Sequence, residues 1–187
     1  MNAYIKRIAL LPLMVITGWA YASMNGNGID GNMTANQGTN GQRPLVPGAQ
    51  QTPDLKFKDE DGKIISLHSL KGKVVFINLW ATWCSPCVHE MPSIIELRKT
   101  FKDNKDLVFL MVDVDGNMER SKKWMKNKKN DLPVHVLDGE IPRELFTGSI
   151  PTTIIVDKHN NIIGWQVGGA DYSSKEVVDL MKKLLSE

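Results

Sequence analysis

The chain has 187 residues, of which 42% are hydrophobic and 24% charged, with a formal net charge of +2. This length fits one globular domain with short appendages. Lys6 and Arg7 are the only charged residues before Ser23, so without this stretch the 23 basic residues fall to 21 and equal the 21 acidic ones. The remaining chain has no basic excess, which argues against binding to nucleic acid or to an anionic membrane surface.

Residues 1–22 have the parts of a secretory signal peptide. A basic pair is followed by an apolar stretch and by Ala-Tyr-Ala, a small-x-small cleavage site that ends at Ala22. The uncharged run of residues 8–22 is shorter than the roughly 20 residues that a membrane-spanning helix needs, so cleavage is favoured over an uncleaved anchor. An exported protein with two cysteines and no disulfide framework fits a bacterial periplasm.

Residues 23–52 form a low-complexity segment. It is rich in Asn and Gly and contains no aromatic residue. Such a composition buries too little apolar surface to offset the entropy of ordering, so we expect a flexible leader. The folded domain is expected to cover residues 53–187.

Residues 74–92 form the stretch around which the domain is organised. The mostly apolar run of residues 74–80 is rich in β-branched and aromatic residues, and it predicts a strand that is buried on both faces. Two cysteines follow, Cys84 and Cys87, and the pattern becomes helical from Pro86 onward. The pair therefore stands at a helix N-terminus, where unpaired N–H groups and the helix dipole favour a thiolate.

This placement predicts redox chemistry for the cysteine pair. Cys84 precedes the first helical turn and is expected to be the exposed sulfur, with a lowered pKa. Cys87 faces the same side one turn deeper and can close a disulfide with Cys84. Cys84 would attack a substrate disulfide and Cys87 would resolve the mixed disulfide. Pro86 fits because early helical positions need no donor N–H. The alternatives are a structural disulfide or half of a zinc site, and the chain has no second cysteine pair to complete the latter.

The rest of the domain alternates between strands and helices. Asp61-Gly62 is the turn signal of a hairpin over residues 57–66. The other expected elements are a helical turn at 69–71, helices at 86–101, 118–129, 141–146 and 173–185, and strands at 107–114, 134–137, 154–156 and 162–167.

The motifs resemble those of a known superfamily. WATWCSPC (residues 80–87), Pro92 and Ile-Pro-Thr-Thr (residues 150–153) are similar to the thioredoxin superfamily. Within it, residues 70–78 and 154–163 resemble the TlpA/ResA-like periplasmic thiol–disulfide oxidoreductases. The resemblance covers residues 53–187 and implies an α/β thioredoxin-like fold: a central mixed sheet flanked by helices, with an N-terminal hairpin and a strand–helix insert.

The resemblance also implies roles for residues around the cysteines. Pro151 is expected to follow a cis peptide bond beside the cysteine pair. The backbone of Ile150 would then pair with an extended substrate segment. Trp83 is expected to form part of the docking surface. Ser85 and Pro86 occupy the position that tunes the reduction potential.

Asn78 departs from thioredoxin itself, which has a buried aspartate at the matching strand position. Asn cannot titrate, so the proton of the deeper cysteine would travel through water or another carboxylate. Glu90, three residues after Cys87, is a candidate substitute. The simpler expectation for this helical glutamate is an exposed position.

The expected function is the reduction of disulfides in exported proteins, with apocytochrome c as the natural family substrate. This activity needs no cofactor beyond the Cys84–Cys87 disulfide and no metal. The expected partners are protein disulfides and a membrane or periplasmic electron donor, and the expected state is a monomer. Two alternatives stay open. One is a copper chaperone in which His89, His135 or His159 joins the two sulfurs, and the other is a thiol peroxidase.

Overall fold

The computed structural model describes residues 52–187. The predicted signal peptide (1–22) and all of the predicted leader except Thr52 lie outside the described residues. Thr52 is buried, and its hydroxyl donates to the backbone oxygen of Asn160 over 2.6 Å. No helix in this part of the chain combines the length and the apolar character needed to cross a membrane.

The described residues form one seven-stranded mixed sheet with the strand order β2-β1-β5-β4-β3-β6-β7. β3 pairs in parallel with β4, and β4 with β5, whereas the other neighbours are antiparallel. The strands are β1 (Lys56–Lys58), β2 (Ile64–Ser66), β3 (Val74–Trp80), β4 (Leu107–Asp113), β5 (Val134–Leu137), β6 (Thr152–Val156) and β7 (Ile162–Val167).

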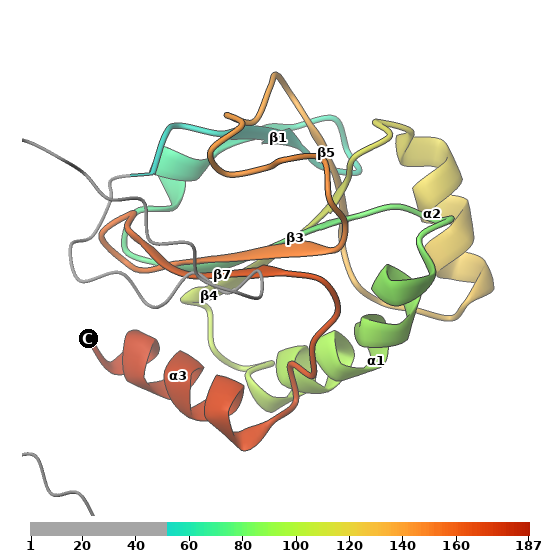
Figure 1. The fold of residues 1–187 in the computed structure, drawn as a ribbon. Helices are drawn as coiled ribbons and strands as arrows, with labels where there is room; N and C mark the ends of the chain where they lie inside the picture. Colours follow the sequence, from blue (N-terminus) through green and yellow to red (C-terminus); the bar gives the residue numbers. More distant parts are fainter. Residues whose placement is uncertain (1–51) are drawn as a thin grey trace, which may run out of the picture. The chain divides into compact units, whose positions relative to one another are not determined.

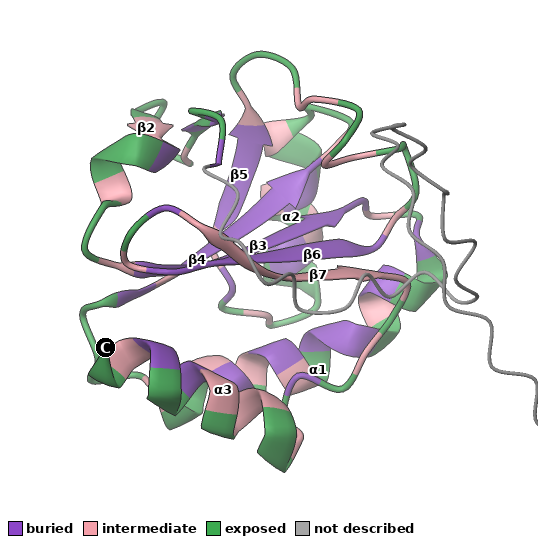
Figure 2. Cartoon of the chain, turned by 60° about the vertical axis from the view of Figure 1, so that its left-hand side comes forward, coloured by how far each residue is buried: buried purple, intermediate pink, exposed green. Residues whose placement is uncertain are grey.

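Three α-helices, α1 (Ser85–Thr100), α2 (Met118–Asn127) and α3 (Lys175–Ser186), contribute buried side chains to one core on a single face of the sheet. Figures 1 and 2 show α1 and α3 side by side along this face. The chain passes from β3 to β4 to β5 in one direction across the sheet. Crossovers between parallel strands are right-handed as a rule, which accounts for α1 and α2 lying on the same side. The mixed sheet with flanking helices confirms the predicted thioredoxin-like fold.

The opposite face of the sheet has a second core without an α-helix over it. Val75, Ile77 and Leu79 of β3 are fully buried there. The 3₁₀-helix η1 (Leu67–Leu70) and the apolar side chains of residues 141–146 pack against them. The predicted helical turn at 69–71 is thus present, but it begins two residues earlier.

The predicted helix at residues 141–146 is wrong. The segment is irregular, with one turn in which the N–H groups of Leu145 and Phe146 both donate to the carbonyl of Pro142. Six residues are too few to form a stable helix by themselves, so tertiary contacts decide the conformation. Ile141, Leu145 and Phe146 instead pack on the helix-free core. The other predicted elements are present within a few residues of their expected bounds.

Candidate active site

The cysteine pair lies at the junction of β3 and α1, as predicted. Cys84 is the N-cap residue of α1, and a disulfide joins it to Cys87 with 5.3 Å between the two Cα atoms. The Cys84 Sγ accepts a hydrogen bond from the backbone N–H of Cys87 at 3.3 Å. Pro86 occupies an early helical position where no donor N–H is required. An N–H group of the first turn is therefore already aimed at the sulfur that would carry the thiolate charge.

The expectation that Cys84 is exposed is wrong for the disulfide form. Cys84 is only 4% exposed and Cys87 only 1%. Both sulfurs belong to the core beneath α1, because the bond to Cys87 ties Cys84 to the buried first turn of the helix. Cys84 is more exposed than Cys87, as predicted, but the difference in exposure is small.

The two tryptophans of the motif lie in opposite surroundings. Trp83 is 66% exposed, and its Nε1 donates to Asp115 Oδ2 at 2.9 Å. Asp115 also forms an ion pair with Arg120, which steadies the exposed indole from the α2 side. Trp80 is fully buried, with its ring 5.6 Å from that of Trp124. Trp83 is thus available at the surface, and Trp80 is part of the core.

The Ile150–Pro151 peptide bond is cis, as predicted. This segment leads directly into β6, whose Thr152 is paired with Leu79 near the end of β3. Because the two strands are antiparallel, the start of β6 and the end of β3 lie at the same edge of the sheet, where Cys84 follows. Ile150 is half-buried, and the Pro151 carbonyl accepts from the N–H of Gly168 at 2.8 Å.

Asn78 is buried and bonded to a carboxylate. Its Nδ2 donates to Glu90 Oε1 at 2.7 Å and to Thr153 Oγ1 at 2.9 Å. The expectation that Glu90 is exposed is wrong, since this side chain is only 4% exposed. Glu90 follows Cys87 by three residues and therefore faces the sheet together with Cys87 and Met91. The helical spacing was the signal that places Glu90 on the same face of α1 as Cys87.

Burial raises the pKa of Glu90 from 4.5 to about 7, because desolvation penalises the charged carboxylate. Hydrogen bonds from Asn78 and from the N–H of Ala170, which lies 3.2 Å from Oε2, oppose this rise. The carboxyl group is thus set to exchange a proton near neutral pH. Such a group beside a reactive pair is a candidate acid or base.

The histidines considered for a copper site are dispersed. His89 is exposed and bonds to the Ser85 carbonyl at 3.0 Å. His135 is buried on β5, and burial lowers its pKa. His159 lies in the turn between β6 and β7. Within residues 52–187, no three His, Cys, Asp or Glu side chains come close enough to hold a metal ion.

Comparisons with known proteins agree with this geometry. The Redoxin family profile matches residues 47–181. The thiol–disulfide oxidoreductase ResA of Bacillus cereus is 33% identical over 120 residues, which cover 64% of this chain and 69% of that protein. A solved Bacteroides vulgatus structure, assigned as a thiol–disulfide oxidoreductase, is 33% identical with a TM-score of 0.64 over 75% of this chain and 98% of that one. A thiol:disulfide interchange protein from Chlorobium tepidum is 29% identical, with a TM-score of 0.54 over 73% and 98%.

The fold and the cysteine pair at the start of α1 define a thiol–disulfide oxidoreductase of the thioredoxin superfamily. The chain belongs to the Redoxin family, among the relatives of the ResA thiol–disulfide oxidoreductases.

Proposed function

We propose that this oxidoreductase reduces disulfides of exported proteins, with Cys84 as the attacking and Cys87 as the resolving cysteine. The observation that carries the proposal is the position of Cys84 at the N-cap of α1, where its sulfur receives the N–H of Cys87. A thiolate is stabilised there, and Cys87 lies within bonding distance one turn deeper.

In the first step, the Cys84 thiolate attacks one sulfur of a substrate disulfide. A mixed disulfide forms between Cys84 and the substrate, and the second substrate sulfur leaves as a thiolate that takes a proton from solvent. The cis Ile150–Pro151 segment lies at the same sheet edge as Cys84, so an extended substrate segment can pair with the backbone of Ile150. The exposed Trp83 would provide apolar docking area beside it.

In the second step, Cys87 loses its proton and attacks the Cys84 sulfur, which releases the reduced substrate and closes the Cys84–Cys87 disulfide. Glu90 is the proposed acceptor of that proton. It lies on the same face of α1 as Cys87, and its raised pKa matches transfer near neutral pH. Two electrons pass from the dithiol to the substrate, so a dithiol donor must restore the reduced pair.

In this proposal the Cys84–Cys87 pair is the redox centre, and no metal or organic cofactor takes part. The signal-like residues 1–22 support export to the periplasm, with a membrane or periplasmic protein as electron donor. We further propose a monomer, and apocytochrome c among its substrates.

Trapping the mixed disulfide tests the proposal. Cys87→Ser removes the resolving thiol but keeps the attacking one, so this variant should accumulate covalent complexes that dithiothreitol releases. Cys84→Ser is the matched control and should trap nothing. Circular dichroism verifies that both variants are folded, and mass spectrometry of the released proteins tests for apocytochrome c. Folded Cys87→Ser protein without any dithiothreitol-sensitive complex would refute the assigned roles.

A further inference from the structure

The amide of Asn78 has an orientation that leaves one of its atoms unsatisfied. Both of its N–H groups are used, one toward Glu90 Oε1 and the other toward Thr153 Oγ1. Its Oδ1 is buried and has no hydrogen-bond partner among the described residues. A buried acceptor without a donor is costly, so the two N–H contacts must hold the amide in this orientation.

The orientation matters because the Asn78 amide faces a carboxyl group that titrates. The ionised Glu90 can only accept hydrogen bonds, and the N–H groups of Asn78 and Ala170 supply them. The Ala170 donor belongs to the backbone and is fixed. The Asn78 amide could turn by half a rotation and present Oδ1, which repels a carboxylate but accepts from a protonated carboxyl group. The orientation therefore decides which charge state of Glu90 is stabilised.

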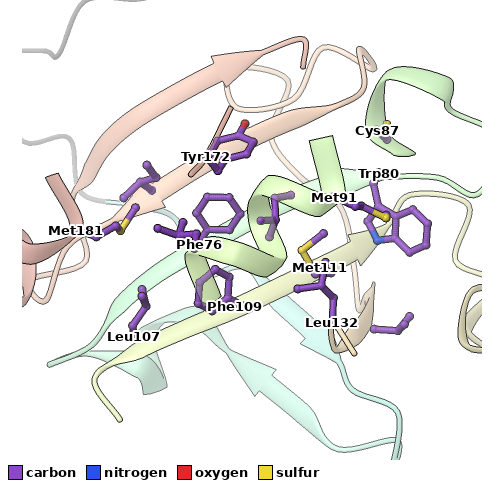
Figure 3. Packing of buried hydrophobic residues seen from close by; sticks show 14 of the residues in the cluster. Phe76, Trp80, Cys87, Met91, Leu107, Phe109, Met111, Leu132, Tyr172 and Met181 are labelled. Carbon is purple, nitrogen blue, oxygen red and sulfur yellow. The ribbon is translucent and has the colours of Figure 1, made fainter. Parts of the chain in front are cut away.

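Thr153 and Tyr172 hold this amide in place. Thr153 lies opposite Asn78 in the β3–β6 pairing and accepts its second N–H. The Tyr172 hydroxyl donates to Thr153 Oγ1 at 2.6 Å, and both residues are buried. The Tyr172 ring packs edge-on against the Phe76 ring, with 5.0 Å between the ring centroids. Figure 3 shows the two rings as neighbours in the core. The backbone N–H of Tyr172 donates to Ser93 Oγ on α1, so Tyr172 is also hydrogen-bonded to the helix that carries Glu90.

We propose that Thr153 and Tyr172 are positioning residues of the thiol–disulfide reaction, which keep the Asn78 N–H groups turned toward Glu90 and so stabilise its ionised form. The inference rests on the proposed role of Glu90 as proton acceptor for Cys87. Neither residue touches the reacting sulfurs in this account. Each acts through Asn78.

The other groups around Glu90 do not supply this control. β3 and β6 contribute Asn78 and Thr153, neither of which titrates. Burial, and secondarily the Glu90 charge, raise the pKa of Tyr172 far above neutrality, so its hydroxyl stays protonated. On α1, the neighbouring titratable side chains are His89, which is exposed and bonds to the Ser85 carbonyl, and the Cys87 thiol of the reduced protein.

The test is a carbon NMR titration of Glu90 in the oxidised full-length protein labelled at the glutamate carboxyl carbon, with Glu90→Gln to assign the signal. The parent midpoint is expected at about 7. Thr153→Val keeps the side-chain shape but removes the acceptor, and should raise the midpoint by about one unit or more. Tyr172→Phe keeps the ring and frees the Thr153 hydroxyl, so it should raise the midpoint by less. Thr153→Ser keeps the hydroxyl acceptor and should leave the Glu90 midpoint at its parent value.

An unchanged midpoint in both Thr153→Val and Tyr172→Phe, whatever their melting temperatures, would overturn the inference, since a merely structural role lowers stability alone. The titration uses the disulfide form and so does not depend on turnover. The same variants should shift the pH profile of Cys87 resolution by the same amount. If the variants shift the Glu90 midpoint but not the pH profile of Cys87 resolution, Glu90 is not the proton acceptor of the proposed function. Thr153 and Tyr172 would then still control the charge of Glu90.

Discussion

On one face of β3, the side chains of Val75, Ile77 and Leu79 are fully buried among other apolar side chains. On the opposite face, Asn78 and Trp80 are as deeply buried, but each has a polar atom without a hydrogen-bond partner among the described residues. We name these the aliphatic face and the reactive face. Unsatisfied buried polar atoms cost stability, and among the side chains of β3 they occur only on the face beneath the cysteine helix. The same strand thus anchors the fold on one side and holds the chemistry on the other.

Truncation on the aliphatic face should have the largest effect on stability and none on chemistry. Ile77→Ala removes fully buried atoms and should lower the free energy of unfolding by about 2–5 kcal/mol, as measured in urea. The pH dependence of Cys84 alkylation in the folded variant should stay that of the parent. A shifted alkylation profile would break the separation between the two faces.

Glu90→Gln tests the reactive face through pH. The folded pKa of about 7 lies above the ordinary 4.5, so the unfolded chain releases this proton more readily. The contribution of Glu90 to stability is fully present below pH 4.5 and is lost as pH rises to about 7. Relative to Glu90→Gln, the parent should lose about 3 kcal/mol between pH 4 and pH 8.

The matched control for that comparison is Glu96→Gln. Glu96 lies on the same helix, but it is exposed and paired with Lys99. Its stability difference from the parent should change little over this pH range, because exposed ion pairs contribute little. Equal pH dependence in the two variants would mean that Glu90 does not have a raised pKa.

Asn78→Asp places a second carboxyl group beside Glu90, within the 2.7 Å contact that the amide now makes. Two carboxyl groups this close share one proton, so one pKa rises strongly. The variant should lose about 1–3 kcal/mol of stability at pH 8. Rapid-mixing kinetics should show a shifted pH dependence of Cys87 resolution, with little change in attack by Cys84. Identical resolution profiles would place the proton route elsewhere.

Trp83→Ala should have the smallest effect on stability, within about 0.5 kcal/mol, because the side chain is largely exposed. Its kcat/KM for a protein disulfide should fall, while that for a small disulfide such as oxidised glutathione should not. Trp83→Phe keeps an aromatic ring and loses only the bond to Asp115, so it should behave more like the parent. Equal losses on both substrates would argue against a docking role.

The aliphatic face was predictable, and the reactive face was predictable only in part. A mostly apolar run rich in β-branched and aromatic residues is sufficient to predict a buried strand, and the cysteine spacing at a helix start predicts the disulfide. The burial of Glu90 depends on the approach of the Ala170 segment, 80 residues away in the chain. Helical spacing placed Glu90 beside Cys87 but could not show what would cover it. The helix predicted at residues 141–146 was wrong for the same reason, because tertiary packing overrode the local helical pattern.

The two sulfurs are both nearly inaccessible in the disulfide, and the assigned roles of Cys84 and Cys87 require their reactivities to differ once the pair is reduced. The measurement that tests this most directly is the alkylation rate of each cysteine in the reduced protein against pH, with the modified peptides resolved by mass spectrometry. Cys84, with the Cys87 N–H aimed at its sulfur, should titrate below the free-thiol value of about 8.5, and the deeper Cys87 above it. An inflection for Cys84 at or above that value, or faster alkylation of Cys87, would contradict the assignment of the attacking and resolving cysteines.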